Sequence, residues 1–158
     1  MTADLIDLTN ADRIHHWHGF TQMAAYEPLL IERAEGCWLM DPQGQRWLGG
    51  VSSLWCNIHG HRHPRIDQAV REQLDRVAHV TNIGMGCTTT ARLAARLAAL
   101  APGDLQHVFF SSDGASAVEV AIKMALQFWR QGNTTASAKK CRYLALGSAY
   151  HGDTVGTV

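Results

Sequence analysis

Apolar and polar positions follow a helical period in three parts of the chain. The clearest begins at Ser116, where apolar side chains recur every three or four residues and predict an amphipathic helix. A second helix is predicted from Pro64, which suits a first helical turn, to about Val77. A third starts at Thr88–Thr90, which offer N-caps, and ends before Pro102-Gly103. The apolar positions that define the helix beginning at Ser116 are Val118, Ala121, Ile122, Ala125, Leu126 and Trp129.

Short apolar runs predict strands in two places. Between Leu29 and Leu48 the runs LLIERA, CWLMD and RWL are separated by turn residues, which predicts a small antiparallel element. The runs 107–111 and 143–146 flank the helix that begins at Ser116, and they are typical of buried parallel strands in a right-handed β-α-β unit. A polar loop, 132–140, is expected between that helix and the second strand.

These elements predict an α/β protein in two parts. Residues 1–58 form an N-terminal segment with the small antiparallel hairpin, and residues 59–158 form the first part of a large, mainly parallel-sheet domain. An α/β sheet needs more strands than these to close its core, so the chain is expected to be truncated.

Composition narrows the class of protein. Hydrophobic residues make up 46% and charged residues 18%, the balance of a packed soluble core. Lys plus Arg equals Asp plus Glu at 14 each, so no net charge attracts nucleic acid or an anionic membrane. The N-terminus does not resemble a signal peptide, and no apolar run is long enough to span a bilayer. The widely spaced cysteines favour reduced thiols in the cytoplasm; they are Cys37, Cys56, Cys87 and Cys141.

The turn SSDGAS is a candidate anion site. Gly114 stands at the start of the helix, where free backbone N–H groups and the positive end of the helix dipole attract phosphate. The alternative is that Ser112 or Asp113 only caps the helix. A second candidate is Tyr150, in the stretch Tyr150-His151-Gly152-Asp153, because ligands of open α/β folds bind where strands end. Its alternative is a tyrosine that merely covers the end of the sheet.

Histidines and tryptophans supply weaker candidates. His59, His61 and His63 would share one face of an extended segment and could bind zinc or copper. Gly60 favours a turn instead, so structural or substrate-lining histidines are preferred to metal ligands. Trp55 lies in an irregular, polar stretch and is the tryptophan best suited to line a pocket, with ordinary packing as the alternative.

Four stretches in this order resemble the class III, fold-type I aminotransferases: HHWHGFTQM, VSSLWCNIHGHRHP, SSDGASAVEVAIKMALQFW and AYHGDTVG. The resemblance runs from about His16 to Val158 and is strongest to the members that act in biotin biosynthesis. It implies pyridoxal 5′-phosphate as cofactor and a homodimer. It also implies transfer of an amino group from S-adenosylmethionine to 8-amino-7-oxononanoate, which gives 7,8-diaminononanoate.

The same resemblance assigns roles to individual residues. Gly114 and Ala115 would donate backbone N–H groups to the cofactor phosphate, and Tyr150 would stack on its ring and border the substrate. Leu54, Trp55 and Phe20 would line the substrate pocket. Phe20 replaces a frequent tyrosine, Leu54 a tryptophan and Ala115 a serine or threonine; the last change removes a hydroxyl donor, a loss of about 1 kcal/mol.

The resemblance also implies that no catalytic residue lies in these 158 residues. The Schiff-base lysine of the family would lie downstream of Val158, and none of Lys123, Lys139 and Lys140 matches it, so the isolated chain is expected to be inactive. Two alternatives remain open. One is another class III enzyme that acts on ornithine, 4-aminobutyrate or a similar ω-amine, and the other is a non-enzymatic, histidine-rich metal-binding module.

Overall fold

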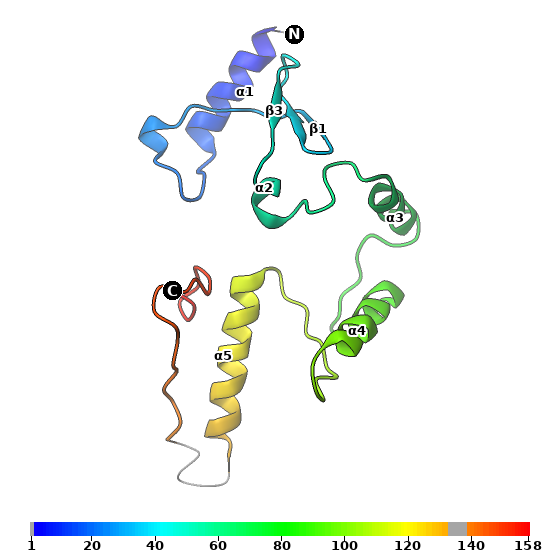
Figure 1. The fold of residues 1–158 in the computed structure, drawn as a ribbon, viewed down its shortest axis with the longest axis vertical. Helices are drawn as coiled ribbons and strands as arrows, with labels where there is room; N and C mark the ends of the chain where they lie inside the picture. Colours follow the sequence, from blue (N-terminus) through cyan, green and yellow to red (C-terminus); the bar gives the residue numbers. More distant parts are fainter. Residues whose placement is uncertain (1, 133–138) are drawn as a thin grey trace. The chain divides into compact units, whose positions relative to one another are not determined.

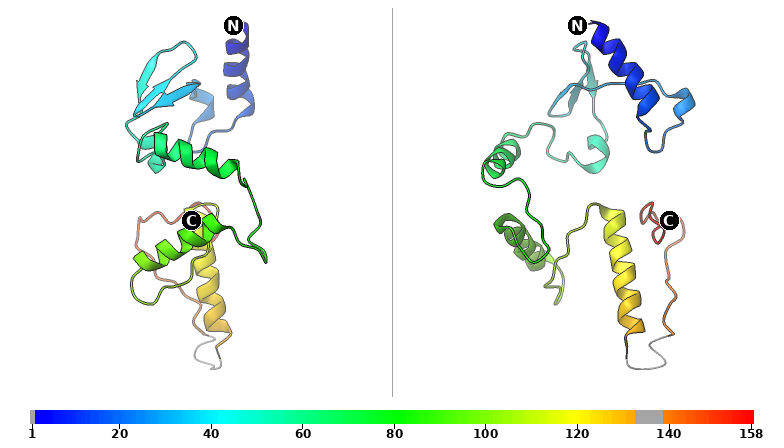
Figure 2. Two further views of the ribbon diagram at one scale, coloured as in Figure 1. Left: turned by 90° about the vertical axis from the view of Figure 1, so that its right-hand side faces the viewer. Right: turned by 180° about the vertical axis from the view of Figure 1, so that it is seen from behind.

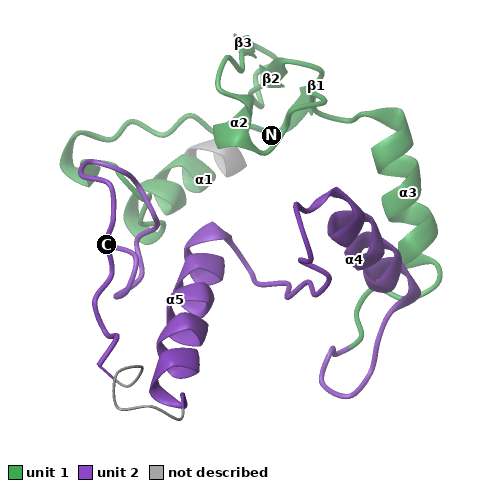
Figure 3. Ribbon diagram, turned by 60° about the horizontal axis from the view of Figure 1, so that its bottom comes forward, with its two compact units in different colours: residues 1–80 green, residues 81–158 purple. Residues whose placement is uncertain are grey.

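The computed structural model describes residues 2–132 and 139–158, and it divides the chain into two compact units, residues 1–80 and 81–158 (Figure 3). The domain boundary predicted after residue 58 stays a prediction. No helix among the described residues is long and apolar enough to cross a membrane.

The first unit begins with helix α1 (Thr2–His15) and a short 3-10 turn, η1 (Met23–Ala25). Three strands follow, β1 (Arg33–Glu35), β2 (Trp38–Met40) and β3 (Arg46–Leu48), and they form one antiparallel sheet in the order β1-β2-β3 (Figure 1). The small antiparallel element predicted from the sequence is therefore confirmed. Two helical elements complete the unit, α2 (Ser52–Trp55) and α3 (Pro64–Leu74).

Asp41 holds the turn between β2 and β3. Its side chain is one of two buried polar side chains among the described residues. It accepts hydrogen bonds from the backbone N–H groups of Gln43 and Gln45, at 3.0 and 2.8 Å, and from the Trp47 indole at 3.3 Å. An aspartate that accepts from the backbone two residues ahead stabilises a turn, so Asp41 fixes the register of this hairpin.

A pair of backbone hydrogen bonds ties the β1–β2 turn to the segment before α3. Gly36 N–H donates to His61 O at 2.9 Å, and His61 N–H donates to Gly36 O at 2.8 Å. Gly60 has φ +78°, and a side chain there would lie 3.1 Å from the Gly36 backbone. The glycine turn predicted at residue 60 is present, so His59, His61 and His63 do not lie along one face of a flat strand.

The second unit contains α4 (Thr88–Leu100) and α5 (Gly114–Arg130). All three predicted helices are thus present, although α3 ends at Leu74 rather than Val77 and α5 begins at Gly114. The N-cap of α4 is Cys87, so Thr88–Thr90 form its first turn and do not cap it as expected. Figure 2 shows the C-terminal segment running beside α5, where the Tyr143 hydroxyl donates to the Ile122 carbonyl at 2.7 Å.

The predicted parallel strands are not formed among the described residues. Segments 107–111 and 143–146 carry no strand hydrogen bonds, because neither has a neighbouring strand to pair with. The expected polar loop at 132–140 falls largely on residues 133–138, outside the described part of the chain.

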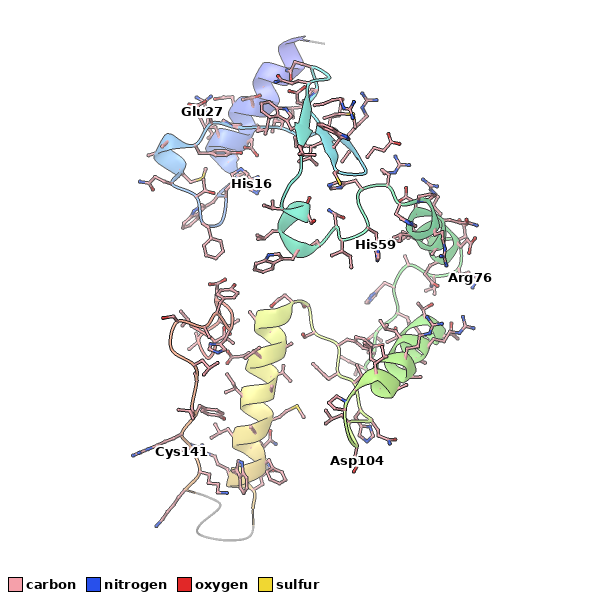
Figure 4. All side chains as sticks on the ribbon, in the orientation of Figure 1. His16, Glu27, His59, Arg76, Asp104 and Cys141 are labelled. Carbon is pink, nitrogen blue, oxygen red and sulfur yellow. The ribbon has the colours of Figure 1, made fainter. Side chains whose placement is uncertain are left out.

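The expected packed core is also absent from the described residues: none of their hydrophobic side chains is buried. Even Trp129, on the apolar stripe of α5, remains 36% exposed, and Phe128 is 69% exposed. Figure 4 shows side chains projecting from α5 both toward the C-terminal segment and away from it. The amphipathic stripe was predicted correctly, but no other element among the described residues buries it.

Candidate functional site

The N-terminus of α5 is organised by Asp113, its N-cap residue. The Asp113 carboxylate accepts a hydrogen bond from the Ser116 backbone N–H at 2.7 Å and another from the Ser116 hydroxyl at 2.9 Å. These bonds, the one from the backbone first, hold the pKa of Asp113 below its usual range. Asp113 therefore caps the helix as a carboxylate, which was one of the two interpretations left open by the sequence.

Gly114 leaves open space at this helix end. A side chain added there would meet no atom within 4 Å. The backbone N–H groups of the first helical turn lack partners inside the helix, and the positive end of the helix dipole favours an anion. The neighbouring Asp113 charge opposes one. A phosphate at this turn must therefore gain more from the backbone N–H groups than it loses to Asp113.

The segment that carries Tyr150 returns to the same helix end. Gly152 is buried and has φ +138°, a conformation open to glycine but not to residues with side chains. A Cβ atom at Gly152 would overlap the Ala115 side chain and lie only 2.8 Å from the Ala115 Cα. The structure thus brings together two stretches singled out separately in the sequence, Gly114-Ala115 and 150–153.

Tyr150 is 64% exposed, so much of its side chain is accessible to a ligand. Its hydroxyl donates to the Asp153 carboxylate. This hydrogen bond, followed by desolvation and by the charges of Asp153 and Asp113, raises the pKa of Tyr150 above its usual value. The phenol therefore stays neutral at physiological pH, so the ring can stack on a ligand without carrying a charge.

Glu119, on the second turn of α5, was not identified from the sequence. Its carboxylate accepts hydrogen bonds from the Thr154 hydroxyl at 2.6 Å and from the Gly156 backbone N–H at 2.8 Å. These bonds, Thr154 first, hold the pKa of Glu119 below its usual range. Thr154 and Gly156 lie 35 and 37 positions after Glu119, so no local sequence pattern predicts these hydrogen bonds.

The three residues predicted to line a substrate pocket all belong to the first unit. Phe20 is 92% exposed, Trp55 74% and Leu54 59%. No described contact joins Phe20 to the other two. Two surface hollows in this unit, of about 200 and 520 Å³, are lined by other residues. The role of Phe20, Leu54 and Trp55 as substrate contacts stays a prediction.

Leu54 and Trp55 sit in a single turn of unusual hand. Four consecutive residues without glycine, Ser52–Trp55, have positive φ values of 50°, 48°, 56° and 73°. The turn is closed by hydrogen bonds from the Trp55 N–H to Val51 O and from the Cys56 N–H to Ser52 O. A left-handed turn costs about 1–2 kcal/mol per residue, and backbone strain of this kind clusters at functional sites. The functional role of this turn stays a prediction.

Among the described residues, one group places three ligand-type atoms within metal-binding reach: Asp12, His16 and His18. The nitrogens of His59, His61 and His63 form no such group, so the structure gives no support to that alternative. The Asp12 carboxylate accepts from His16 Nδ1 at 3.0 Å, from His18 Nε2 at 3.1 Å and from the Tyr26 hydroxyl at 3.1 Å. These bonds explain the cluster without an ion; they tie the end of α1, with the labelled His16 in Figure 4, to the chain that follows.

This network predicts a pH dependence. The hydrogen bond from His16 is the largest influence that lowers the pKa of Asp12; burial opposes it, and His18 and Tyr26 assist it. A carboxyl whose pKa is lowered by folding stabilises the fold above its unfolded pKa, about 3.9, and this contribution is lost as the pH falls through the folded value. The local structure is therefore expected to persist at neutral pH and to loosen in acid.

The measurement is a pH titration of the Asp12 side-chain carbonyl carbon by NMR. The midpoint is expected below the usual aspartate value, and His16→Ala should move it upward. Asp7→Asn, an exposed change on the same helix, is the matched control and should leave it in place. An Asp12 midpoint that His16→Ala does not move would show that the network is not formed.

The chain is similar to known proteins over most of its length. The family Aminotransferase class-III matches residues 21–158. The adenosylmethionine-8-amino-7-oxononanoate aminotransferase of Nitratidesulfovibrio vulgaris is 52% identical over 154 residues, which cover 96% of this chain and 28% of the relative. That of Aquifex aeolicus is 46% identical over 150 residues, 93% of this chain and 32% of the relative.

Solved structures give the same result. The adenosylmethionine-8-amino-7-oxononanoate aminotransferase of Methanocaldococcus jannaschii superposes with a TM-score of 0.89 at 39% identity, covering 98% of this chain and 35% of that one. An (S)-enantioselective omega-transaminase of Thermomicrobium roseum gives 0.72 at 41% identity, covering 79% and 29%. The chain spans about a third of the length of its relatives, and it belongs to the class III aminotransferase family.

Proposed function

We propose that this chain is the N-terminal part of a pyridoxal-phosphate-dependent aminotransferase of biotin biosynthesis. The enzyme would move an amino group from S-adenosylmethionine to 8-amino-7-oxononanoate and so form 7,8-diaminononanoate. Several relatives named for this reaction are 39–52% identical to the chain over almost its whole length. Identity at this level over so many residues supports a shared reaction as well as a shared fold.

The observation that carries the proposal is the packing of Gly152 on Ala115. It puts an exposed, neutral aromatic ring and a helix N-terminus in the same part of the second unit. Pyridoxal phosphate needs both, because its phosphate is an anion and its pyridine ring is flat and apolar on each face. The residues therefore fit the cofactor, although the Asp113 charge weakens the phosphate end of the site.

Each residue would have a limited task. The bound cofactor supplies the electron sink that amino transfer requires, and the protein supplies binding and orientation. Gly114 and Ala115 would hold the phosphate through backbone N–H groups, and the neutral Tyr150 would cover one face of the ring. Phe20, Leu54 and Trp55 would line the substrate side, where the left-handed turn would set the direction of the last two.

The remaining features of the proposed enzyme belong to a longer protein. They are the parallel sheet, a homodimer and the lysine that binds the cofactor. Lys140 is already engaged, because its ammonium lies 3.5 Å from the centre of the Trp129 ring. Lys123 lies on α5 and is exposed. Residues 1–158 alone are therefore expected to show no transaminase activity.

A chimera tests the proposal. Residues 1–158 would replace the matching segment of the Nitratidesulfovibrio vulgaris relative, followed by the rest of that relative. The chimera is expected to bind pyridoxal phosphate, seen by its visible absorbance, and to form 7,8-diaminononanoate from S-adenosylmethionine and 8-amino-7-oxononanoate. Residues 1–158 alone and the intact relative are the negative and positive controls.

Two failures have different meanings. A folded chimera that binds no pyridoxal phosphate would refute the proposed function. A chimera that binds the cofactor but uses only simple ω-amines would favour the second candidate, an ω-transaminase. That candidate is supported by the Thermomicrobium roseum structure, at 41% identity. It is also supported by Leu54 in the turn Ser52–Trp55, which is smaller than the tryptophan it replaces.

A further inference from the structure

We infer that Glu119 is a positioning residue for the cofactor ring: its carboxylate anchors residues 154–157 to α5 and thereby holds Tyr150 at the start of that helix. The inference rests on the proposed function, since Tyr150 matters here as the residue that covers the ring. Glu119 itself would touch neither cofactor nor substrate.

The anchor is made of short hydrogen bonds at one carboxylate oxygen. Glu119 Oε2 accepts from the Thr154 hydroxyl at 2.6 Å and from the Gly156 N–H at 2.8 Å. A carboxylate that accepts two donors in this way makes stronger bonds than a neutral acceptor would. The Thr154 and Gly156 donors come from one short loop, so a single side chain of α5 fixes that loop.

The loop is also braced internally. The Thr157 side chain is the second buried polar side chain among the described residues, and its hydroxyl accepts from the Thr154 backbone N–H at 2.8 Å. The two threonine hydroxyls lie 2.8 Å apart, and the Thr157 hydroxyl donates to the Thr154 backbone carbonyl at 3.3 Å. These contacts hold Thr154 and Thr157 together beside Glu119.

The Gly156 backbone packs closely against the Glu119 carboxylate. A side chain at Gly156 would lie 2.6 and 2.8 Å from the two carboxylate oxygens of Glu119. Gly152 packs against Ala115 in the same way, one helical turn earlier on α5. The segment 150–157 is therefore held at two points, Ala115 and Glu119, and Tyr150 emerges just before the first.

The alternative is that Glu119 only stabilises the unit, without consequence for the ring. A purely structural role would lower stability and leave cofactor affinity untouched in the folded protein. A positioning role would weaken cofactor binding in protein that remains folded. The two roles are separated by measuring affinity and local exchange in the same samples.

The test uses the chimera with Glu119→Ala, with Glu119→Gln as the conservative variant and Gln127→Ala, two turns further along α5, as the matched control. Hydrogen exchange of peptide 150–158 by mass spectrometry reports the anchor in cofactor-free protein. The dissociation constant for pyridoxal phosphate reports the ring site. Glu119→Ala is expected to raise both at least tenfold, whereas Glu119→Gln retains an acceptor and recovers most of the loss.

The outcomes are distinct. Unchanged exchange in Glu119→Ala would show that there is no anchor, and faster exchange with unchanged affinity would leave an anchor without a positioning role; either overturns the inference. If Glu119→Ala fails to fold, Thr154→Val replaces it as the test, because it removes only one hydrogen-bond donor at nearly constant volume. It is expected to raise the exchange rate of peptide 150–158 and the dissociation constant for pyridoxal phosphate severalfold. If the unsubstituted chimera binds no cofactor, the proposed function fails and the positioning role fails with it, whereas the exchange data still show whether the anchor exists.

Discussion

Replacing Gly152 by alanine is expected to weaken pyridoxal phosphate binding by one to two orders of magnitude in the chimera. Two effects act at this position. Its φ of +138° is strained for any residue with a side chain, and the new methyl group would overlap that of Ala115. Overpacking costs about 1–3 kcal/mol, and a residue forced into a sparsely populated backbone region costs a similar amount.

The strain would be relieved by moving the 150–153 segment off the N-terminus of α5. That movement separates Tyr150 from Gly114 and Ala115, the two halves of the proposed cofactor site. The measurement is an equilibrium titration with pyridoxal phosphate, followed by absorbance. Secondary structure, measured by circular dichroism, should stay the same, because no helix includes Gly152.

Two further variants isolate the cause. Gly147→Ala is the matched control, since a side chain at Gly147 meets no atom within 4 Å and the backbone there is not left-handed. It should bind the cofactor normally. Adding Ala115→Gly to Gly152→Ala should restore part of the affinity, because it removes the overlap with the Ala115 methyl group but neither the close approach to the Ala115 Cα nor the strain in φ. Equal affinities for Gly152→Ala and Gly147→Ala would refute the proposed contact.

The sequence predicted those features that depend on neighbouring residues. The apolar stripe of α5 runs from Val118 to Trp129, so the helix could be predicted without any tertiary information. The antiparallel element was indicated by the turn residues that separate its three runs, and Asp113 was indicated by its place before Gly114. In each case the interactions that form the element lie within a few positions of one another.

Features that depend on distant partners were not predictable. Glu119 has no local signal because Thr154 and Gly156 lie far along the chain. Helix α1 was missed since its apolar residues do not gather on one side. The left-handed turn at Ser52–Trp55 runs against the preferences of its own residues, none of which is glycine.

The two predicted parallel strands fail for a related reason. An apolar run such as 107–111 is suited to a strand, but a strand exists only when another lies beside it to pair its backbone groups. Neither that run nor 143–146 has such a neighbour among the described residues. Their apolar side chains, including Leu144 and Leu146, are left exposed in consequence.

The polypeptide of residues 1–158, studied alone, is therefore expected to self-associate at micromolar concentration. None of its described hydrophobic side chains is buried, and many large ones are exposed to solvent. A typical monomer exposes apolar patches of only a few hundred Å². Burial of apolar surface is the main force that stabilises a fold, so this chain lacks the driving force for a cooperative monomer.

Sedimentation velocity should show species larger than 17.4 kDa, the mass of one chain, and their share should grow with concentration. A hydrophobic dye should bind strongly, and heating should give a broad transition, because no single core melts. The chimera is the control: with the rest of the relative present, dye binding should fall and one sharp transition should appear. A monodisperse 17.4 kDa species with a sharp melt would mean that these apolar surfaces pack against one another in a way the structure does not show. The proposed dependence of this segment on the remainder of an aminotransferase would then be wrong.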